Sequence, residues 1–181
     1  MQLSKNFSLK EMTASQTAAR LGINNNPSED HMNNLKALCE NILQPVRDHY
    51  GKVVSVSSGY RSPELCVKIG SSVNSQHAKG QAADFEIFGV SNSDLCKWIA
   101  NNLDFDQLIL EFHNVDEPNS GWIHCSYNSA EDNRKQILRA YRNEDGKTKY
   151  ENYNPQWKED REELRKDPEK INAHMMDYRS I

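Results

Sequence analysis

The sequence predicts an α+β fold with a mainly antiparallel sheet and helices packed on one face. Helical patterns come first in the chain, and segments of strand composition interrupted by short helices then continue to residue 153. A length of 181 residues suits one domain with an extension better than two full domains. We therefore divide the chain into a domain at residues 1–153 and a charged helical extension at residues 154–181.

Two helices are expected before Gly51. Ser8 and Glu11 have the spacing of a capping box, and the helix that they begin should end near Gly22. Ser28 caps a second helix, which Pro45 should kink or end. The buried face of this helix is a stripe of apolar residues at spacings of three and four, namely Met32, Leu35, Cys39, Ile42 and Val46.

Segments rich in β-branched and aromatic residues predict the strands. They are residues 53–57, 82–88, 105–112 and 122–127, followed by a hairpin of residues 137–141 and 148–153. Asp145-Gly146 lies between the last two segments and is a turn signal. Short helices should begin at Ser62-Pro63 and at Ser91.

Composition excludes several classes of protein. Acidic side chains outnumber basic ones 26 to 22, so the net charge of −4 argues against a dedicated nucleic-acid binder. No run approaches the roughly 20 apolar residues that cross a bilayer, and the first residues lack the apolar segment of a secretory signal. The four cysteines form no CxxC pair, so we expect buried free thiols in a protein made in a cytosol.

The proposed extension differs in composition from the domain. Residues 154–170 hold five basic and six acidic side chains. This pattern favours a solvated helix over a partner-binding tail. Its apolar anchors would be Trp157, Leu164, Ile171 and Met175.

The chemistry is concentrated in residues 75–84 and in a later histidine. His77 and Asp84 are separated by a glycine and small residues, which allow the chain to turn before a strand begins. His124 lies inside another predicted strand. Two imidazoles and one carboxylate form a zinc site with an open fourth position for water, which is typical of a catalytic centre. The alternative is that both histidines are ordinary hydrogen-bonded polar residues, but three ligand types in this pattern favour the metal.

These motifs resemble those of the zinc D-Ala-D-Ala carboxypeptidases and phage endolysin peptidases, a group with the Hedgehog/DD-peptidase fold. The matching segments, within residues 5–128, are Ser58-Gly59-Tyr60-Arg61-Ser62, Ser75-x-His77-x-x-Gly80-x-Ala82-x-Asp84 and Trp122-x-His124-x-Ser126. The resemblance implies that His77, Asp84 and His124 bind Zn²⁺. It also implies that Arg61 anchors or activates the substrate, with a structural salt bridge as the alternative, and that Ser75 binds the substrate by a hydrogen bond.

The general base is not contained in the three matching segments. Some relatives carry a glutamate three residues before the last histidine ligand, where this chain has Gly121. Glu111 ends the preceding predicted strand and would share a face with His124 if the two strands pair. We therefore predict Glu111 as the base, with Asp116 and Glu117 of the following loop as rivals.

The resulting hypothesis is a monomeric zinc peptidase that cleaves amide bonds in peptidoglycan stem peptides. Without a visible secretory signal, a phage-type lysin is expected, made in the host cytosol and active on the wall after release. The alternatives are a non-catalytic zinc-containing wall-binding or virion structural module, and a cytosolic D-Ala-D-Ala dipeptidase.

Overall fold

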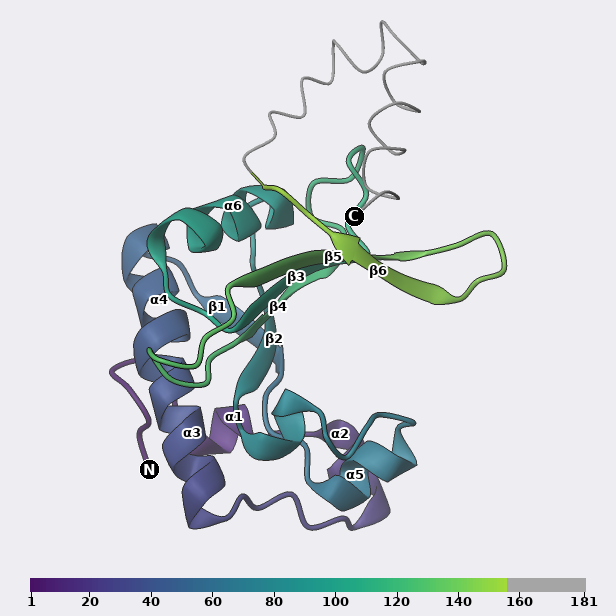
Figure 1. The fold of residues 1–181 in the computed structure, drawn as a ribbon. Helices are drawn as coiled ribbons and strands as arrows, with labels where there is room; N and C mark the ends of the chain where they lie inside the picture. The colour runs from purple at the N-terminus through teal and green to yellow at the C-terminus, as the bar shows by residue number, and fades with distance from the viewer. Residues whose placement is uncertain (156–181) are drawn as a thin grey trace, which may run out of the picture.

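A six-stranded sheet organises the domain in the computed structural model, which describes residues 1–155 (Figure 1). The strands are β1 (Val54–Ser58), β2 (Ala82–Ile87), β3 (Gln107–Glu111), β4 (Trp122–Ser126), β5 (Gln136–Arg142) and β6 (Thr148–Asn152). Their order in the sheet is β1-β2-β4-β3-β5-β6, and each neighbouring pair is antiparallel except β3 and β5. The predicted α+β class is confirmed. The predicted extension lies outside the described residues from residue 156 onward.

The helical elements precede and interrupt the strands. They are α1 (Leu9–Met12), α2 (Gln16–Leu21), α3 (Glu29–Leu38), the π-helical turn η1 (Cys39–Leu43), α4 (Gln44–Tyr50), α5 (Pro63–Lys68), the 3₁₀ turn η2 (Gln76–Lys79) and α6 (Asn92–Asn102). No described helix has both the length and the apolar character that a bilayer crossing requires.

The first expected helix is in fact two. The Ser8 side chain accepts a hydrogen bond from the Glu11 amide and begins α1, as predicted. However, Ser15 then accepts one from the Ala18 amide and begins α2. The predicted end of this segment is correct, because Gly22 closes α2 with a left-handed φ of 66°.

The second expected helix continues past Pro45. Elements α3, η1 and α4 follow one another without a break from Ser28 to Gly51. Proline has no N–H for the helical ladder, and the π-helical turn lies directly before the first turn of α4, which contains Pro45. The proline therefore coincides with a change of helix type rather than with the end of the helix.

Helices α3, α4 and α6 cover one face of the sheet (Figure 1). Alternation along the strands sends Phe85, Leu108 and Ile123 into the core with these helices. The intervening residues Asp84, Ile109 and His124 point to the other face. One face of the sheet thus forms the core, and the other is free to build a site. All four cysteines are free and buried.

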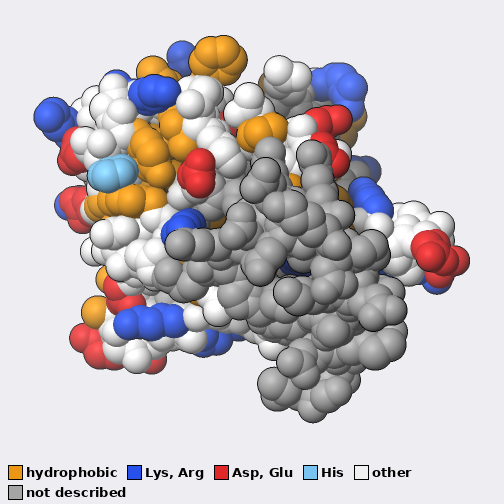
Figure 2. All heavy atoms as spheres, turned by 90° about the horizontal axis from the view of Figure 1, so that it is seen from above, with side chains coloured by type: hydrophobic (Ala, Val, Ile, Leu, Met, Phe, Trp, Pro, Cys, Tyr) orange, Lys and Arg blue, Asp and Glu red, His pale blue; other side chains and the backbone are white. Residues whose placement is uncertain are grey.

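Aromatic side chains join α4 to α6 at the edge of this core. His49 stacks on Trp98 with ring centroids 4.2 Å apart, and Tyr50 meets Trp98 edge to face. Figure 2 looks down on this end of the molecule and shows hydrophobic side chains gathered there among charged ones.

Asp106 fastens the beginning of β3 to two other segments. Its side chain is buried and accepts hydrogen bonds from the backbone amide, Nε and Nη2 of Arg134. Gln76 Nε2 donates to the same carboxylate at 2.8 Å. The hydrogen bonds of Arg134 hold the pKa of Asp106 at about 2. The carboxylate thus ties η2 and the segment before β5 to the beginning of β3.

We predict that Asp106→Asn lowers the free energy of unfolding by about 2 kcal/mol, because charge-assisted bonds to a buried group are lost. The loss stays below that of a fully buried ion pair, since 55% of the Arg134 side chain is exposed. Urea unfolding at pH 7 measures it. Because the folded pKa lies below the unfolded one, the difference from wild type should narrow as the pH falls from about 4 to about 2. Glu40→Gln, at the exposed Lys36–Glu40 pair, is the control and should change stability by less than about 0.5 kcal/mol. Equal losses in the two variants would contradict this account of Asp106.

Candidate metal centre

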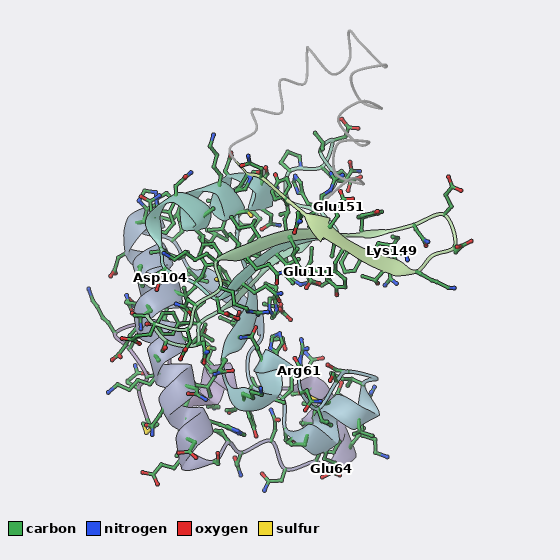
Figure 3. The ribbon with its side chains drawn as sticks, viewed as in Figure 1. Arg61, Glu64, Asp104, Glu111, Lys149 and Glu151 are labelled. Carbon is green, nitrogen blue, oxygen red and sulfur yellow. The ribbon has the colours of Figure 1, made fainter. Side chains whose placement is uncertain are left out.

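A cavity of about 610 Å³ opens on the face of the sheet that α3, α4 and α6 leave uncovered. Strands β2, β3 and β4 line one side of it, and the segments that join β1 to β2 line the other. Figure 3 shows Glu111 entering from the sheet and Arg61 facing it from the segment after β1. Groups from distant parts of the sequence therefore meet in one cleft.

Strand register brings Asp84 and His124 together. Asp84 on β2 pairs directly with His124 on β4. Directly paired residues of antiparallel strands point to the same face of a sheet. The His124 Nδ1 lies 2.8 Å from the Asp84 Oδ1, and both residues are buried.

His77 reaches the same point from η2. The Ser75 hydroxyl accepts a hydrogen bond from the His77 amide at the beginning of this turn, and Gly80 ends the turn with a φ of 71°. A Cβ on Gly80 would lie 2.4 Å from the His31 carbonyl oxygen of α3, so the turn packs against the helix too closely for a side chain. This packing fixes η2 so that the His77 Nε2 lies 3.2 Å from both the Asp84 Oδ1 and the His124 Nδ1.

A count of protons shows that these three groups suit a cation. The His77 Nδ1 must donate to the Gly59 carbonyl oxygen, 2.7 Å away, because a carbonyl only accepts. Burial lowers the pKa of His77, so the ring is neutral and its Nε2 carries a lone pair. One proton, on the His124 Nδ1, is then left to serve three contacts of 3.2 Å or less. A bound cation would be coordinated by all three atoms at once.

The donor set fits zinc. In residues 1–155, His77, Asp84 and His124 form one group whose ligand atoms all lie within 4.8 Å of one another. Ligands of tetrahedral zinc lie about 3.3 Å apart, close to the separations found here. The hydrogen bond from His77 to a backbone carbonyl is the usual support of a zinc-binding imidazole. Three protein ligands leave one tetrahedral position for solvent or substrate.

The Arg61 side chain is bound to one of the candidate metal ligands, Asp84. Its Nη2 donates to the Asp84 Oδ2 at 2.7 Å, and its Nε donates to the Ser58 hydroxyl at 2.8 Å. Burial alone would raise the pKa of Asp84, but the contacts of its carboxylate with the His124 and His77 imidazoles hold this pKa well below its usual value. The structure thus contains a salt bridge of Arg61, which was expected from the sequence as the alternative to a substrate role for this residue. It also keeps Arg61 in the cavity wall, where a substrate role stays a prediction.

Glu111 ends β3 and lines the same cavity. It pairs directly with Trp122 on β4, two residues before His124, so it shares the face of His124. Burial raises the pKa of Glu111, and the negative charge of Asp84 raises it further. A carboxyl group with a raised pKa is suited to accept a proton and return it near neutral pH.

The rival acids lie elsewhere. Asp116 and Glu117 belong to the loop between β3 and β4, and neither lines the cavity in the part of the chain described here. Gly121 has a φ of 69°, and a Cβ there would lie 1.9 Å from the Glu111 carbonyl oxygen. The chain therefore has no room for a glutamate at residue 121. Among the described residues that line the cavity, Glu111 is the carboxylate besides Asp84.

Several groups that line the cavity were not predicted from the sequence as parts of the site. The Trp122 Nε1 is buried without a hydrogen-bond partner among the described residues. Gln107 and Ile109 follow from the alternation of β3 and were open to prediction. Leu138 and Tyr150 were not, because their place depends on the parallel pairing of β5 with β3. Ser75 lines the cavity as well, and its predicted bond to substrate stays a prediction.

Comparison with known families supports this interpretation. A family model described as Peptidase M15 matches residues 5–126, about two thirds of the chain. All six predicted site residues lie inside this range, whereas Leu138 and Tyr150 lie beyond it. No curated protein matches the chain significantly.

We predict that His77→Ala and His124→Ala each abolish stoichiometric zinc binding, because two ligands cannot hold the ion tightly. Metal analysis after dialysis should give close to one zinc per chain for wild type and well under one tenth of that for each variant. His113→Ala is the matched control. Its ring is partly buried and contacts the Ser120 carbonyl oxygen, and it is not among the residues that line the cavity. Zinc retained by both ligand variants would show that the ion binds elsewhere.

We also predict that Gly121→Ala is much more destabilising than Gly146→Ala. Both glycines have a positive φ, which costs alanine about 1–2 kcal/mol. Only the Gly121 variant adds a clash with backbone, since nothing lies within 4 Å of a Cβ on Gly146. Chemical unfolding should show a further loss of about 2 kcal/mol in Gly121→Ala. Similar stabilities of the two variants would mean that the end of β3 is not held as described.

Proposed function

This chain belongs to the peptidase M15 family of zinc-dependent peptidases, and we propose that it hydrolyses amide bonds in the stem peptides of bacterial peptidoglycan. One observation carries the proposal. The group formed by His77, Asp84 and His124 lies in the wall of an open cavity that also presents Glu111 and Arg61. A purely structural metal site would have four protein ligands and no need of an acid or a guanidinium beside it.

The residues of the cleft divide the work of hydrolysis. Zinc held by His77, Asp84 and His124 would supply Lewis-acid chemistry, lowering the pKa of water and polarising a carbonyl group. Glu111 takes a proton from the attacking water while the water oxygen bonds to the carbonyl carbon of the substrate. Glu111 then gives that proton to the amide nitrogen as the carbon–nitrogen bond breaks.

Arg61 contributes binding and charge. Its Nε and Nη2 are engaged by Ser58 and Asp84, which holds the guanidinium plane in place. The Nη1 edge is then the part that can donate to a carbonyl or carboxylate of the substrate. Ser75, at the beginning of η2, is a second candidate donor to the peptide.

The size of the cavity favours a longer peptide over a dipeptide as the substrate. Its volume of about 610 Å³ lies within the range of ligand pockets, roughly 300–1,000 Å³, and exceeds what two alanines would fill. The choice of peptidoglycan comes from the resemblance of the three motifs to those of D-Ala-D-Ala carboxypeptidases and phage endolysins. We propose the phage-type role on the same ground, with a monomeric protein made in the cytosol that acts on the wall after release.

Products released from purified peptidoglycan test this proposal. Zinc-loaded protein should cleave sacculi, mass spectrometry of the soluble products should identify the bond, and a chelator should stop the reaction. Bound zinc with no cleavage of any wall peptide would favour a non-catalytic wall-binding or virion module. Cleavage of free D-Ala-D-Ala alone would favour a dipeptidase.

We predict that Glu111→Gln keeps one zinc per chain and lowers kcat by roughly 10²–10⁴-fold, because the amide cannot accept the proton. Metal analysis and the rate of product release measure the two effects separately. Glu117→Gln is the matched control and should retain the wild-type rate. A fall in rate with Glu117→Gln instead of Glu111→Gln would transfer the role of base to the loop.

A further inference from the structure

The hairpin of β5 and β6 supplies part of the cavity wall from outside the family match. The match ends at residue 126, whereas β5 begins at Gln136 and β6 ends at Asn152. Leu138 on β5 and Tyr150 on β6 both line the cavity that holds the candidate metal ligands. This hairpin extends the sheet beyond β3, as Figure 1 shows.

Register places Tyr150 in one row with the proposed base. Glu111 pairs with Ala140 on β5, and Ala140 pairs with Tyr150 on β6. Residues paired in this way share a face of the sheet, and two strand spacings put Glu111 and Tyr150 about 10 Å apart at their Cα atoms. Ala140 between them is buried and has only a methyl group, so no long side chain separates the phenol ring from the carboxylate. In the neighbouring row, Leu138 pairs with Ile109, which pairs with His124.

The Tyr150 side chain is available to a ligand. The residue is 55% exposed although it lines the cavity, and its hydroxyl has no hydrogen-bond partner in residues 1–155. Burial of part of the ring raises the pKa of Tyr150, and so does the charge of Glu111. Tyr141 on the same hairpin is different, because it points to the opposite face and lies under the Arg139 guanidinium.

We propose that Leu138 and Tyr150 form a subsite for a part of the peptide substrate distant from the reacting bond. The subsite rests on the proposed peptidase function and makes the cleft selective for longer peptides. The tyrosine ring and the leucine would pack against an aliphatic side chain, and the phenol hydroxyl would bond to a peptide group. Strand β6 lies three strands from His124 on β4, about 14 Å, which an extended peptide covers in about four residues. The reach of the tyrosine side chain shortens this distance, so we expect contact within about three residues of the reacting bond.

Kinetics on peptides of different length test the subsite. The substrates are the shortest peptide that the wild type cleaves and the same peptide extended by three residues at its amino end or at its carboxyl end. For one of the two extended peptides, Tyr150→Ala should raise KM roughly 10-fold with kcat within about twofold, while the shortest peptide is unaffected. Leu138→Ala should act on the same peptide, and Tyr150→Phe should show a smaller effect because it loses only the hydroxyl. Tyr141→Ala is the matched control and should behave as wild type on all three.

Two results would overturn the subsite while the peptidase function stands. One is an unchanged KM of Tyr150→Ala for both extended peptides. The other is an equal loss on short and long peptides together with a lower melting temperature, which would make Tyr150 a structural residue.

Failure of the peptidase proposal is recognised separately, by a zinc-loaded wild type that cleaves no peptide. Binding of a labelled five-residue stem peptide to zinc-loaded protein, followed by fluorescence anisotropy, then decides the subsite. Weaker binding by Tyr150→Ala than by Tyr141→Ala supports it, and equal binding overturns it.

Discussion

The pairing of β2 with β4 sets Asp84 opposite His124, and the group of candidate metal ligands depends on this register. A slip of β2 by one residue would send Asp84 into the core and bring a neighbour such as Phe85 to the cavity, and a slip of β4 would do the same to His124 and Cys125. The buried alternation on the core face therefore holds the register, because Phe85 and Ile123 must remain against the helices. Packing on one face of the sheet thus determines chemistry on the other.

The charged groups of the cleft are arranged around Asp84. Of its two oxygens, Oδ2 accepts from Arg61, and Oδ1 faces the two imidazoles. The charged residues that line the cavity are Arg61, Asp84 and Glu111, which together leave one negative charge before any ion binds. A buried negative charge beside two imidazole nitrogens and one spare proton is stabilised by a divalent cation. Arg61 therefore supports the candidate metal ligands through Asp84 and also lines the cavity.

Local signals in the sequence predicted several helix ends and the residues of the candidate site. The segment from Ser75 to Asp84 contains its own turn, with a cap at Ser75 and a left-handed Gly80, so the approach of His77 to Asp84 could be inferred from nearby residues. Glu111 could be placed on the face of His124 because the two predicted strands follow one another in the chain, and consecutive strands commonly pair with each other. The helix ends at Gly22 and Gly51 were signalled by the glycines themselves.

The features that the sequence did not predict depend on contacts between residues that are far apart in the chain. The break between α1 and α2 is set by Ser15, a cap that the longer helical pattern concealed. No local pattern indicated that β5 would pair in parallel with β3, and so Leu138 and Tyr150 were not expected in the cleft. The requirement for glycine at residue 121 came from the Glu111 carbonyl of the neighbouring strand. Such constraints become visible only when both strands are in place.

A crystal structure of the zinc-loaded protein, with the ion located by anomalous scattering, tests the central claim most directly. The account predicts one zinc ion about 2.0–2.2 Å from the His77 Nε2, the Asp84 Oδ1 and the His124 Nδ1, with solvent as the fourth ligand. An ion bound elsewhere, or one whose fourth ligand is a protein side chain such as Glu111, would contradict it.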